Sequence, residues 1–268
     1  MIILLTNDDG IEAPGLVALY KATRELGEVH VAAPSKVRSA CGHAVTFHRP
    51  LEAWTVSVTD DEGEPLFDGT AVYGMPADCV KLGRSKLVPG PVDVVISGIN
   101  AGCNVGVHTL YSGTVAAARE AAMAGISAIS MSLFLRNRNE IRWDRASEIA
   151  HDCLASILSK PLPAGTFLNV NIPILDDGAE PKGVRVVPAL LSAMVDDYQG
   201  EPDADGHGVY KVGRGVAFGE VYEGSDARSL FDGYITITPM MFDPTDHPAL
   251  DLWRSRLESD ECDEEPET

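Results

Sequence analysis

The chain has 268 residues, of which 45% are hydrophobic and 23% charged, as expected for one globular α/β domain with an appendage. The formal net charge is −19, from 40 acidic and 21 basic residues, and a surface this negative argues against a nucleic-acid duplex as partner. No apolar run approaches the roughly 18 residues of a membrane span, and the five cysteines form no C-x-x-C pair, so we expect a cytoplasmic protein without a disulfide framework or a zinc site.

The N-terminal third predicts strand, helix and strand in that order. Residues 2–5 form an apolar run typical of a strand buried on both faces. A helix is expected over 14–26, where Pro14 suits the first turn. Residues 28–33 then read as a second strand, ended by Pro34.

The same alternation continues along the chain. Residues 92–96 predict a buried strand ended by Ser97 and Gly98, the alanine-rich segment 114–124 predicts a helix, and 126–133 predicts the next strand. Repeated strand–helix–strand order indicates a doubly wound, mostly parallel, Rossmann-like sheet. Later elements are expected as a helix over 145–158 and strands over 167–172 and 184–188.

The chain divides by composition into four parts. Residues 1–189 predict the Rossmann-like core, and 190–232, rich in Gly and Asp, predict an extended β-hairpin arm used in oligomerisation. Residues 233–257 predict a return strand, over 233–239, and a C-terminal helix. Segment 258–268 contains seven acidic residues and predicts a disordered tail.

Four polar clusters follow the ends of predicted elements: 7–10, 34–43, 97–106 and 111–114. Open α/β sheets bind ligands at the carboxyl edge of their strands. Asp8 and Asp9 would repel each other unless a cation or donors lay nearby, and their hard oxygens suit Mg²⁺ or Mn²⁺. The alternative for this cluster is a solvated turn, since Asn, Asp and Gly all form turns.

The other clusters also allow both a functional and a purely structural interpretation. Cluster 97–106 combines Asn100 and Asn104 with glycines, but its spacing matches neither G-x-G-x-x-G nor Walker A, and it could be a plain connection. Residues 112–114 precede a helix, where Ser or Thr caps the backbone or the N-terminus binds phosphate. His43 and His108 are expected as packing or surface residues rather than catalytic ones.

Taken together, the motifs of this chain resemble the SurE family of metal-dependent nucleotidases. The matching segments are TNDDGIEAPGL (6–16), AAPSKVRSACGHAVT (32–46), YGMPADCVKLG (73–83), VVISGINAGCNVG (94–106), YSGTVAAAREAAMAGI (111–126), FLNVNIP (167–173) and GSDARSLFDGYITITP (224–239).

The resemblance implies an enzyme that hydrolyses nucleoside 5′-monophosphates, and also 3′-monophosphates and short polyphosphate. It implies one divalent cation per subunit, Mg²⁺ or Mn²⁺ with Ca²⁺ also accepted, and a homodimer or homotetramer joined through the 190–232 arm. The cation ligands would be Asp8, Asp9, Ser39 and Asn100. The catalytic residues would be Asp8, aligning or deprotonating water, and Asp9; a phospho-aspartyl route through Asp8 stays open. The phosphate and substrate contacts would be Asn7, Gly42, Asn104, Ser112, Gly113 and Thr114.

One position departs from the family pattern. Ala40 stands where many relatives carry Gly after the metal-binding serine. If the loop needs positive φ there, Ala40 would disturb it, unless Gly42 supplies the freedom. We expect any consequence in substrate preference rather than in metal binding.

Three alternatives compete with the nucleotidase. A receiver-type phospho-acceptor module needs about half this length and an acceptor aspartate where this chain has 97–100. A haloacid-dehalogenase-type phosphatase needs a D-x-D opening, which is absent. A protein that binds nucleotide or metal without catalysis would show cation binding and no turnover.

Overall fold

The structure, a computed structural model, describes residues 1–60, 62–136, 141–163, 165–175, 178–192, 194–195, 197–212, 217–218 and 220–258. Most of the tail predicted to be disordered, 259–268, lies outside the described residues. Among the described residues, no helix is both long and apolar enough to cross a lipid bilayer.

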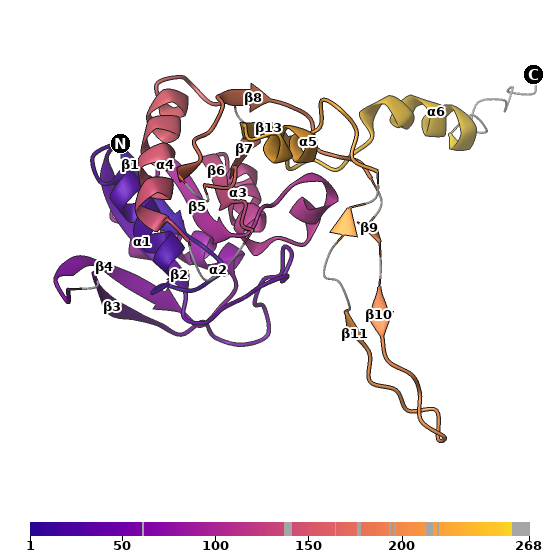
Figure 1. Ribbon diagram of the computed structural model, residues 1–268, viewed down its shortest axis with the longest axis horizontal. Helices are drawn as coiled ribbons and strands as arrows, with labels where there is room; N and C mark the ends of the chain where they lie inside the picture. Colours follow the sequence, from indigo (N-terminus) through magenta and orange to yellow (C-terminus); the bar gives the residue numbers. More distant parts are fainter. Residues whose placement is uncertain are drawn as a thin grey trace, which may run out of the picture.

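A nine-stranded sheet with the order β3-β4-β2-β1-β5-β6-β7-β13-β8 forms the centre of the fold (Figure 1). All neighbouring pairs are parallel except β3 with β4 and β13 with β7. This confirms the α/β fold with a mostly parallel sheet. The strands are β1 (Ile2–Thr6), β2 (Glu28–Pro34), β3 (Ala53–Thr59), β4 (Pro65–Val72), β5 (Val94–Ala101), β6 (Ser127–Leu133), β7 (Thr166–Ile172), β8 (Val184–Val186) and β13 (Ile235–Met241).

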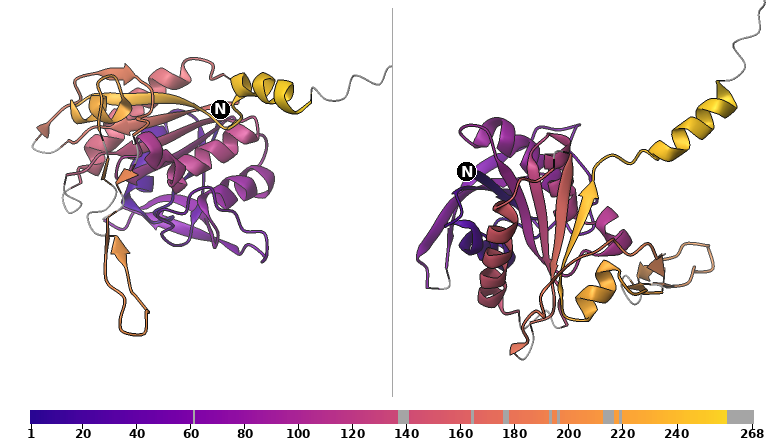
Figure 2. Two further views of the ribbon diagram at one scale, coloured as in Figure 1. Left: turned by 90° about the vertical axis from the view of Figure 1, so that its right-hand side faces the viewer. Right: turned by 90° about the horizontal axis from the view of Figure 1, so that it is seen from above.

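Helices cover both faces of the sheet (Figure 2). On one face α1 (Pro14–Thr23) packs against α4 (Trp143–Leu158), and on the other α2 (Pro76–Leu82) packs against α3 (Gly113–Met123). The alanines of α3 let this helix lie close to the strands, and Ala117, Ala118 and Ala121 are fully buried. Short η1 (Gly83–Leu87) and η2 (Gly106–Leu110) turns complete the connections.

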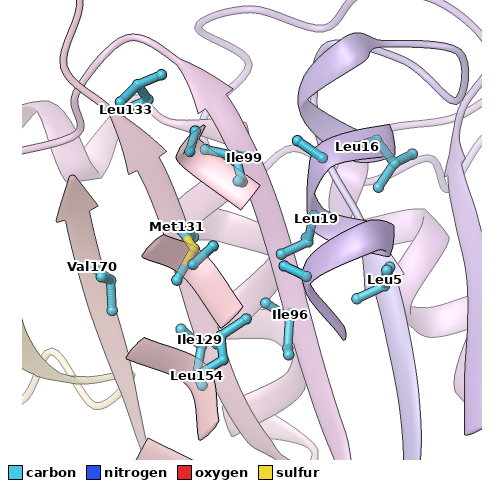
Figure 3. Packing of buried hydrophobic residues seen from close by; sticks show 14 of the residues in the cluster. Leu5, Leu16, Leu19, Ile96, Ile99, Ile129, Met131, Leu133, Leu154 and Val170 are labelled. Carbon is cyan, nitrogen blue, oxygen red and sulfur yellow. The ribbon is translucent and has the colours of Figure 1, made fainter. Parts of the chain in front are cut away.

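The larger core cluster lies between the sheet and helices α1 and α4. Leu16 and Leu19 of α1 project onto Leu5 and Ile96 of the central strands, and Leu154 of α4 lies over β6 (Figure 3). Each of these side chains is fully buried, and burying a leucine stabilises a fold by roughly 1.5–3 kcal/mol. This packing holds β1 and β5 rigidly, and their ends carry the candidate site.

The structure extends or shifts several predicted boundaries. Strand β5 continues to Ala101 instead of ending at Ser97, with a register irregularity between Ser97 and Asn100. Helix α1 ends at Thr23 rather than residue 26, because a tight turn precedes β2. The β3–β4 hairpin and α2 were not predicted. β3 is the edge strand of the sheet, and its Trp54, Val56 and Val58 alternate with Thr and Ser, a strand pattern that the prediction missed.

Most of the 190–232 segment lies outside the main sheet. Two small antiparallel pairs, β9 (Met194–Val195) with β12 (Ala217–Phe218) and β10 (Tyr198–Gln199) with β11 (Lys211–Val212), form an arm that projects from the body (Figure 1). Helix α5 (Asp226–Phe231) then returns to pack beside β13. The last helix, α6 (His247–Leu257), extends away from the sheet and buries none of its residues.

Candidate active site

The candidate site lies at the carboxyl edge of β1 and β5, where the strand order reverses. β1 connects to β2 on one side of itself, whereas β5 pairs on its other side. This is the topological switch point at which open α/β sheets form a crevice for ligands. Thr6 at the end of β1 pairs with Ser97 of β5. Asp8 and Asp9, just after β1, and Asn100, near the end of β5, therefore lie at the ends of neighbouring strands.

Asn7 shapes the turn that presents the two aspartates. Its Nδ2 donates to the Gly10 carbonyl at 2.8 Å, and its Oδ1 accepts from the Gly10 amide at 3.2 Å. Gly10 has φ of 108°, a conformation that glycine adopts without strain. Asn7 is almost fully buried, and both ends of its amide are used in holding the turn; a substrate contact by this residue stays a prediction.

Asp8 is a buried carboxylate that lies against the N-terminus of helix α3. Its Oδ1 accepts a 2.6 Å hydrogen bond from the Thr114 hydroxyl. Burial raises the pKa of Asp8 from 3.8 to about 6; the Thr114 hydrogen bond opposes this shift, and the charge of Asp9 adds to it. Ionising Asp8 is therefore less favourable in the absence of a cation.

Gly113 allows Asp8 to approach the helix. A Cβ built at this position would lie 2.8 Å from both the Asp8 Cβ and the Cys41 Sγ, closer than real side chains come. Any larger residue would push the carboxylate away from the N-terminus of α3. The fold thus requires glycine here on steric grounds, and a phosphate contact at Gly113 stays a prediction.

The loop after β2 brings Ser39 to the same edge. The Arg38 amide donates to the Asp8 carbonyl at 2.7 Å, and the Gly42 amide donates to the Tyr111 carbonyl at 2.9 Å. These two bonds fasten the loop between the β1 turn and the approach to α3. Ser39 lies between them and is exposed, so its hydroxyl is open to a ligand from solvent.

Ala40 occupies the strained conformation that the family pattern suggested. Its φ is 53°, and it is the only non-glycine residue with positive φ among those the structure describes. Gly42 also has positive φ, at 54°. Both positions therefore need the left-handed region, and Gly42 does not replace the freedom missing at position 40.

Near the end of β5, the backbone that follows Asn100 approaches Asp9. Asn100 donates through Nδ2 to the Gly102 carbonyl at 2.7 Å, which leaves its side-chain oxygen as the atom suited to a cation. Asp9 Oδ2 lies 3.5 Å from the Ala101 amide. The irregular end of β5 thus brings the backbone next to Asn100 to Asp9, and coordination of a cation by the Asn100 oxygen stays a prediction.

Asn104 belongs to a buried polar network that the sequence did not reveal. The Asn104 Nδ2 donates to Ser132 Oγ at 2.9 Å, and the backbone N–H of Asn104 donates to Asn171 Oδ1 at 2.8 Å. The backbone carbonyl of Asn104 accepts from the side chains of Asn169 and Asn171. The sequence feature that could have indicated this network is the spacing of two residues in both Ser130–Ser132 and Asn169–Asn171. These residues pair across β6 and β7. Asn104 holds the loop here, and its contact with phosphate stays a prediction.

Ser112 takes the capping role expected at a helix start and Thr114 bonds to Asp8, while a phosphate contact by either residue stays a prediction. Ser112 Oγ accepts from the Val115 amide at 3.2 Å and caps α3, whereas Thr114 reaches Asp8. His43 is bound to Glu120 at 2.9 Å, and Lys81 donates to the same carboxylate at 3.1 Å. His43 is thus tied to a structural carboxylate on α3, away from the acidic pair's own contacts.

The donor set fits a hard divalent cation. Within the described residues there is no group of three or more His, Cys, Asp or Glu side chains arranged for a metal, so a cation would need neutral oxygens as well. Asp8, Asp9, Ser39 and Asn100 offer carboxylate, hydroxyl and amide oxygens, as Mg²⁺ and Mn²⁺ prefer. A cation bound there would favour the ionised form of Asp8 and so oppose the rise in its pKa.

Comparisons with known proteins agree in family and fold. The model of the family described as "Survival protein SurE" matches residues 3–195. A protein named 5′-nucleotidase SurE from Nitratidesulfovibrio vulgaris is 44% identical, covering 94% of this chain and 91% of its own length, and one from Pelobacter propionicus is 41% identical, covering 93% and 97%. The crystal structure of the SurE protein from Aquifex aeolicus superposes with a TM-score of 0.79 at 34% identity, covering 96% of this chain and 99% of its own.

Proposed function

The chain belongs to the SurE family, and from that premise we propose that it is a 5′-nucleotidase, an enzyme that hydrolyses nucleoside 5′-monophosphates to nucleoside and phosphate. Several relatives at 38–44% identity carry that name. The observation that carries the proposal is the hydrogen bond from Thr114 to Asp8, which joins an acidic pair to the N-terminus of α3. A phosphate bound there would meet both a helix N-terminus and the oxygens suited to a cation.

The activity is further proposed to depend on one divalent cation, Mg²⁺ or Mn²⁺, held by Asp8, Asp9, Ser39 and Asn100. When bound, the cation would offset charge on the phosphate and lower the pKa of an attacking water. Hydrolysis of 3′-monophosphates and of short polyphosphate belongs to the same proposal, since both offer a terminal phosphate.

The chain's own residues have separable tasks in this mechanism. Asp8 aligns the attacking water or accepts its proton, and Thr114 fixes the orientation of the Asp8 carboxylate. The amides at the start of α3 stabilise negative charge that builds on the phosphoryl oxygens. Asn104 fixes the loop that follows β5, so that Asn100 is held in place.

The test is phosphate release from a panel of nucleoside 5′- and 3′-monophosphates with Mg²⁺, with Mn²⁺ and with EDTA, for the wild-type chain, Asp9→Ala and Asp8→Asn. Release that requires both the cation and the two aspartates supports the proposal. Folded protein that binds cation but releases no phosphate would support the non-catalytic binding protein instead. Trapping a phosphorylated Asp8 would replace direct attack by water with a phospho-aspartyl route.

The receiver-type alternative finds no support in the geometry. Such a module needs an acceptor aspartate after a later central strand, and the end of β5 carries Asn100. The described cysteines, Cys41, Cys79, Cys103 and Cys153, are free thiols, which suits the cytoplasmic location that we propose. The arm within 190–232 is proposed to join subunits in a homodimer or homotetramer.

A further inference from the structure

Three basic side chains surround one tyrosine ring close to the candidate site. The Arg49 Cζ lies 4.4 Å, the Arg38 Cζ 5.4 Å and the Lys36 Nζ 5.8 Å from the centroid of Tyr73. The negative face of an aromatic ring attracts cations that lie over it. We call Lys36, Arg38, Arg49 and Tyr73 the basic rim.

The cations of the basic rim lack acidic partners within the part of the chain that the structure describes. Among the residues that the structure describes, none of its three cations forms an ion pair, although the chain has 40 acidic residues. Neutral carbonyls hold the guanidinium groups instead: Arg38 Nε donates to Gly74, and Arg49 donates to Pro50 and to Tyr73. Clustered like charges repel, so a multiply charged anion would stabilise this arrangement.

The basic rim lies at the same sheet edge as the acidic pair. β2 and β4 run parallel and end together, with Pro34 opposite Val72, so the loop carrying Lys36 and Arg38 emerges beside Tyr73. The Ser35 amide donates to the Val72 carbonyl at 2.8 Å, and the Arg38 amide donates to the Asp8 carbonyl. Arg38 is therefore one residue from the proposed ligand Ser39 and bonded through its backbone to Asp8.

We propose that the basic rim is a second anion subsite, which binds a phosphate group other than the one being hydrolysed. Its ligand is a substrate with two or more phosphate groups, either a nucleoside bisphosphate or an inorganic oligophosphate. The scissile phosphate sits at the acidic pair and α3, and the remote phosphate sits on Lys36, Arg38 and Arg49. This inference rests on the proposed function and adds to it a binding place for the second phosphate, on residues outside the acidic pair.

The test compares substrates that differ only in the second phosphate. Adenosine 5′-monophosphate, adenosine 3′,5′-bisphosphate and inorganic tripolyphosphate are hydrolysed by the wild-type chain, by the double variant Lys36→Gln/Arg49→Gln and by the control Arg24→Gln, an exposed cation at the end of α1. For at least one multiply phosphorylated substrate, the double variant should raise KM about tenfold with little change in kcat, as expected for loss of roughly 1.4 kcal/mol of binding. The KM for the monophosphate should change much less, and Arg24→Gln should alter neither.

A selective loss with the bisphosphate or with tripolyphosphate supports the subsite and identifies the source of the second phosphate. Equal losses for all three substrates, or no loss, would overturn it. Calorimetric binding of inorganic pyrophosphate to the protein in EDTA separates this inference from the proposed function. Weaker binding in the double variant alone supports the subsite even if no nucleotide is hydrolysed; binding that is unchanged would overturn it.

Discussion

At the scale of single residues, Asp8 is the group whose chemistry the fold changes most. Its pKa is raised from 3.8 to about 6 because the side chain is buried and lies beside Asp9. The metal-free folded protein therefore keeps the Asp8 proton to a higher pH than the unfolded chain does. The corresponding stabilisation is complete below the unfolded pKa of 3.8 and is lost as pH rises through about 6.

We expect the stability of the metal-free protein to show this loss. Between about pH 4 and about pH 7 in EDTA, ionisation of Asp8 should lower the free energy of unfolding by about 3 kcal/mol. Chemical denaturation across this range measures the effect, and Asp8→Asn should lack this component of the pH dependence. Parallel curves for the two proteins would contradict the prediction.

Cation binding should show the complementary dependence. Because a ligand must be deprotonated, the apparent affinity for Mn²⁺ should fall by up to about tenfold for each pH unit below about 6. Titration of the protein with Mn²⁺ at several pH values, followed by electron paramagnetic resonance, measures this change. An affinity that is constant from about pH 5 to about pH 7 would show that Asp8 is not a ligand, or that it is already ionised.

Ala40 gives a third prediction at the residue scale. An alanine at φ of 53° is strained by roughly 1–2 kcal/mol relative to glycine, so Ala40→Gly should raise the free energy of unfolding by about 0.5–1 kcal/mol after the extra unfolded-state entropy is included. The matched control is Ala44→Gly in the same loop, where φ is not positive and the substitution should destabilise. Denaturation curves measure both; a loss of stability in Ala40→Gly would show that the strain is absent in solution.

At the scale of elements, Asp226 joins the arm, helix α5 and the loop after β5. Its carboxylate accepts from the amides of Gly106 and Leu190 at 2.8 Å and of Ala227 at 2.7 Å, and the side chain is completely buried. Burial raises the pKa of Asp226, while these amide bonds oppose that shift. The Asp226 side chain thus connects the segments before and after the arm to the loop that carries Asn104.

Removing this carboxylate should loosen the connection. Asp226→Ala leaves three buried amides without their acceptor, at a cost of roughly 1–3 kcal/mol for each group that stays dry. We expect a loss of several kcal/mol in stability and faster hydrogen exchange of the Gly106 and Leu190 amides. The control Asp232→Ala removes only a half-exposed ion pair with Arg228 and should cost less than about 1 kcal/mol. Similar effects of the two variants would contradict the assigned role of Asp226.

At the scale of the whole molecule, the arm carries apolar surface that this single chain does not cover. Tyr198 is 63% exposed, Val209 78% and Tyr210 54%. Exposed apolar patches of this kind mark interaction surfaces, and closed symmetric assemblies are the common outcome for soluble chains. Burial of these residues against a second copy is the physical basis of the proposed oligomer.

Polar substitutions in the arm should therefore dissociate the assembly. Tyr198→Ser combined with Tyr210→Ser should shift sedimentation from dimer or tetramer toward monomer, while the core keeps its circular dichroism spectrum. Met123→Ser changes an equally exposed residue at the end of α3 and serves as the control. An unchanged sedimentation coefficient for the arm variant would place the interface elsewhere.

The sequence by itself determined the class of fold and the elements that build the site edge. Apolar runs such as 2–5 and the alanine-rich stretch before Gly125 have local periodicity, which fixes strand or helix without knowledge of neighbours. The polar clusters after those elements follow from the same pattern, because parallel strands share a carboxyl edge. The family motifs added the assignment of individual residues within those clusters.

Only the tertiary structure decided which of those residues touch. The bond from Thr114 to Asp8 spans 106 positions, the network of Asn104 with Asn171 spans 67, and the basic rim joins loops after β2 and β4 around Tyr73. Such contacts depend on strand order and on the twist of the sheet, which no local pattern encodes. The positive φ of Ala40 and the raised pKa of Asp8 likewise arise from burial and from loop closure, and these exist only once the chain has folded.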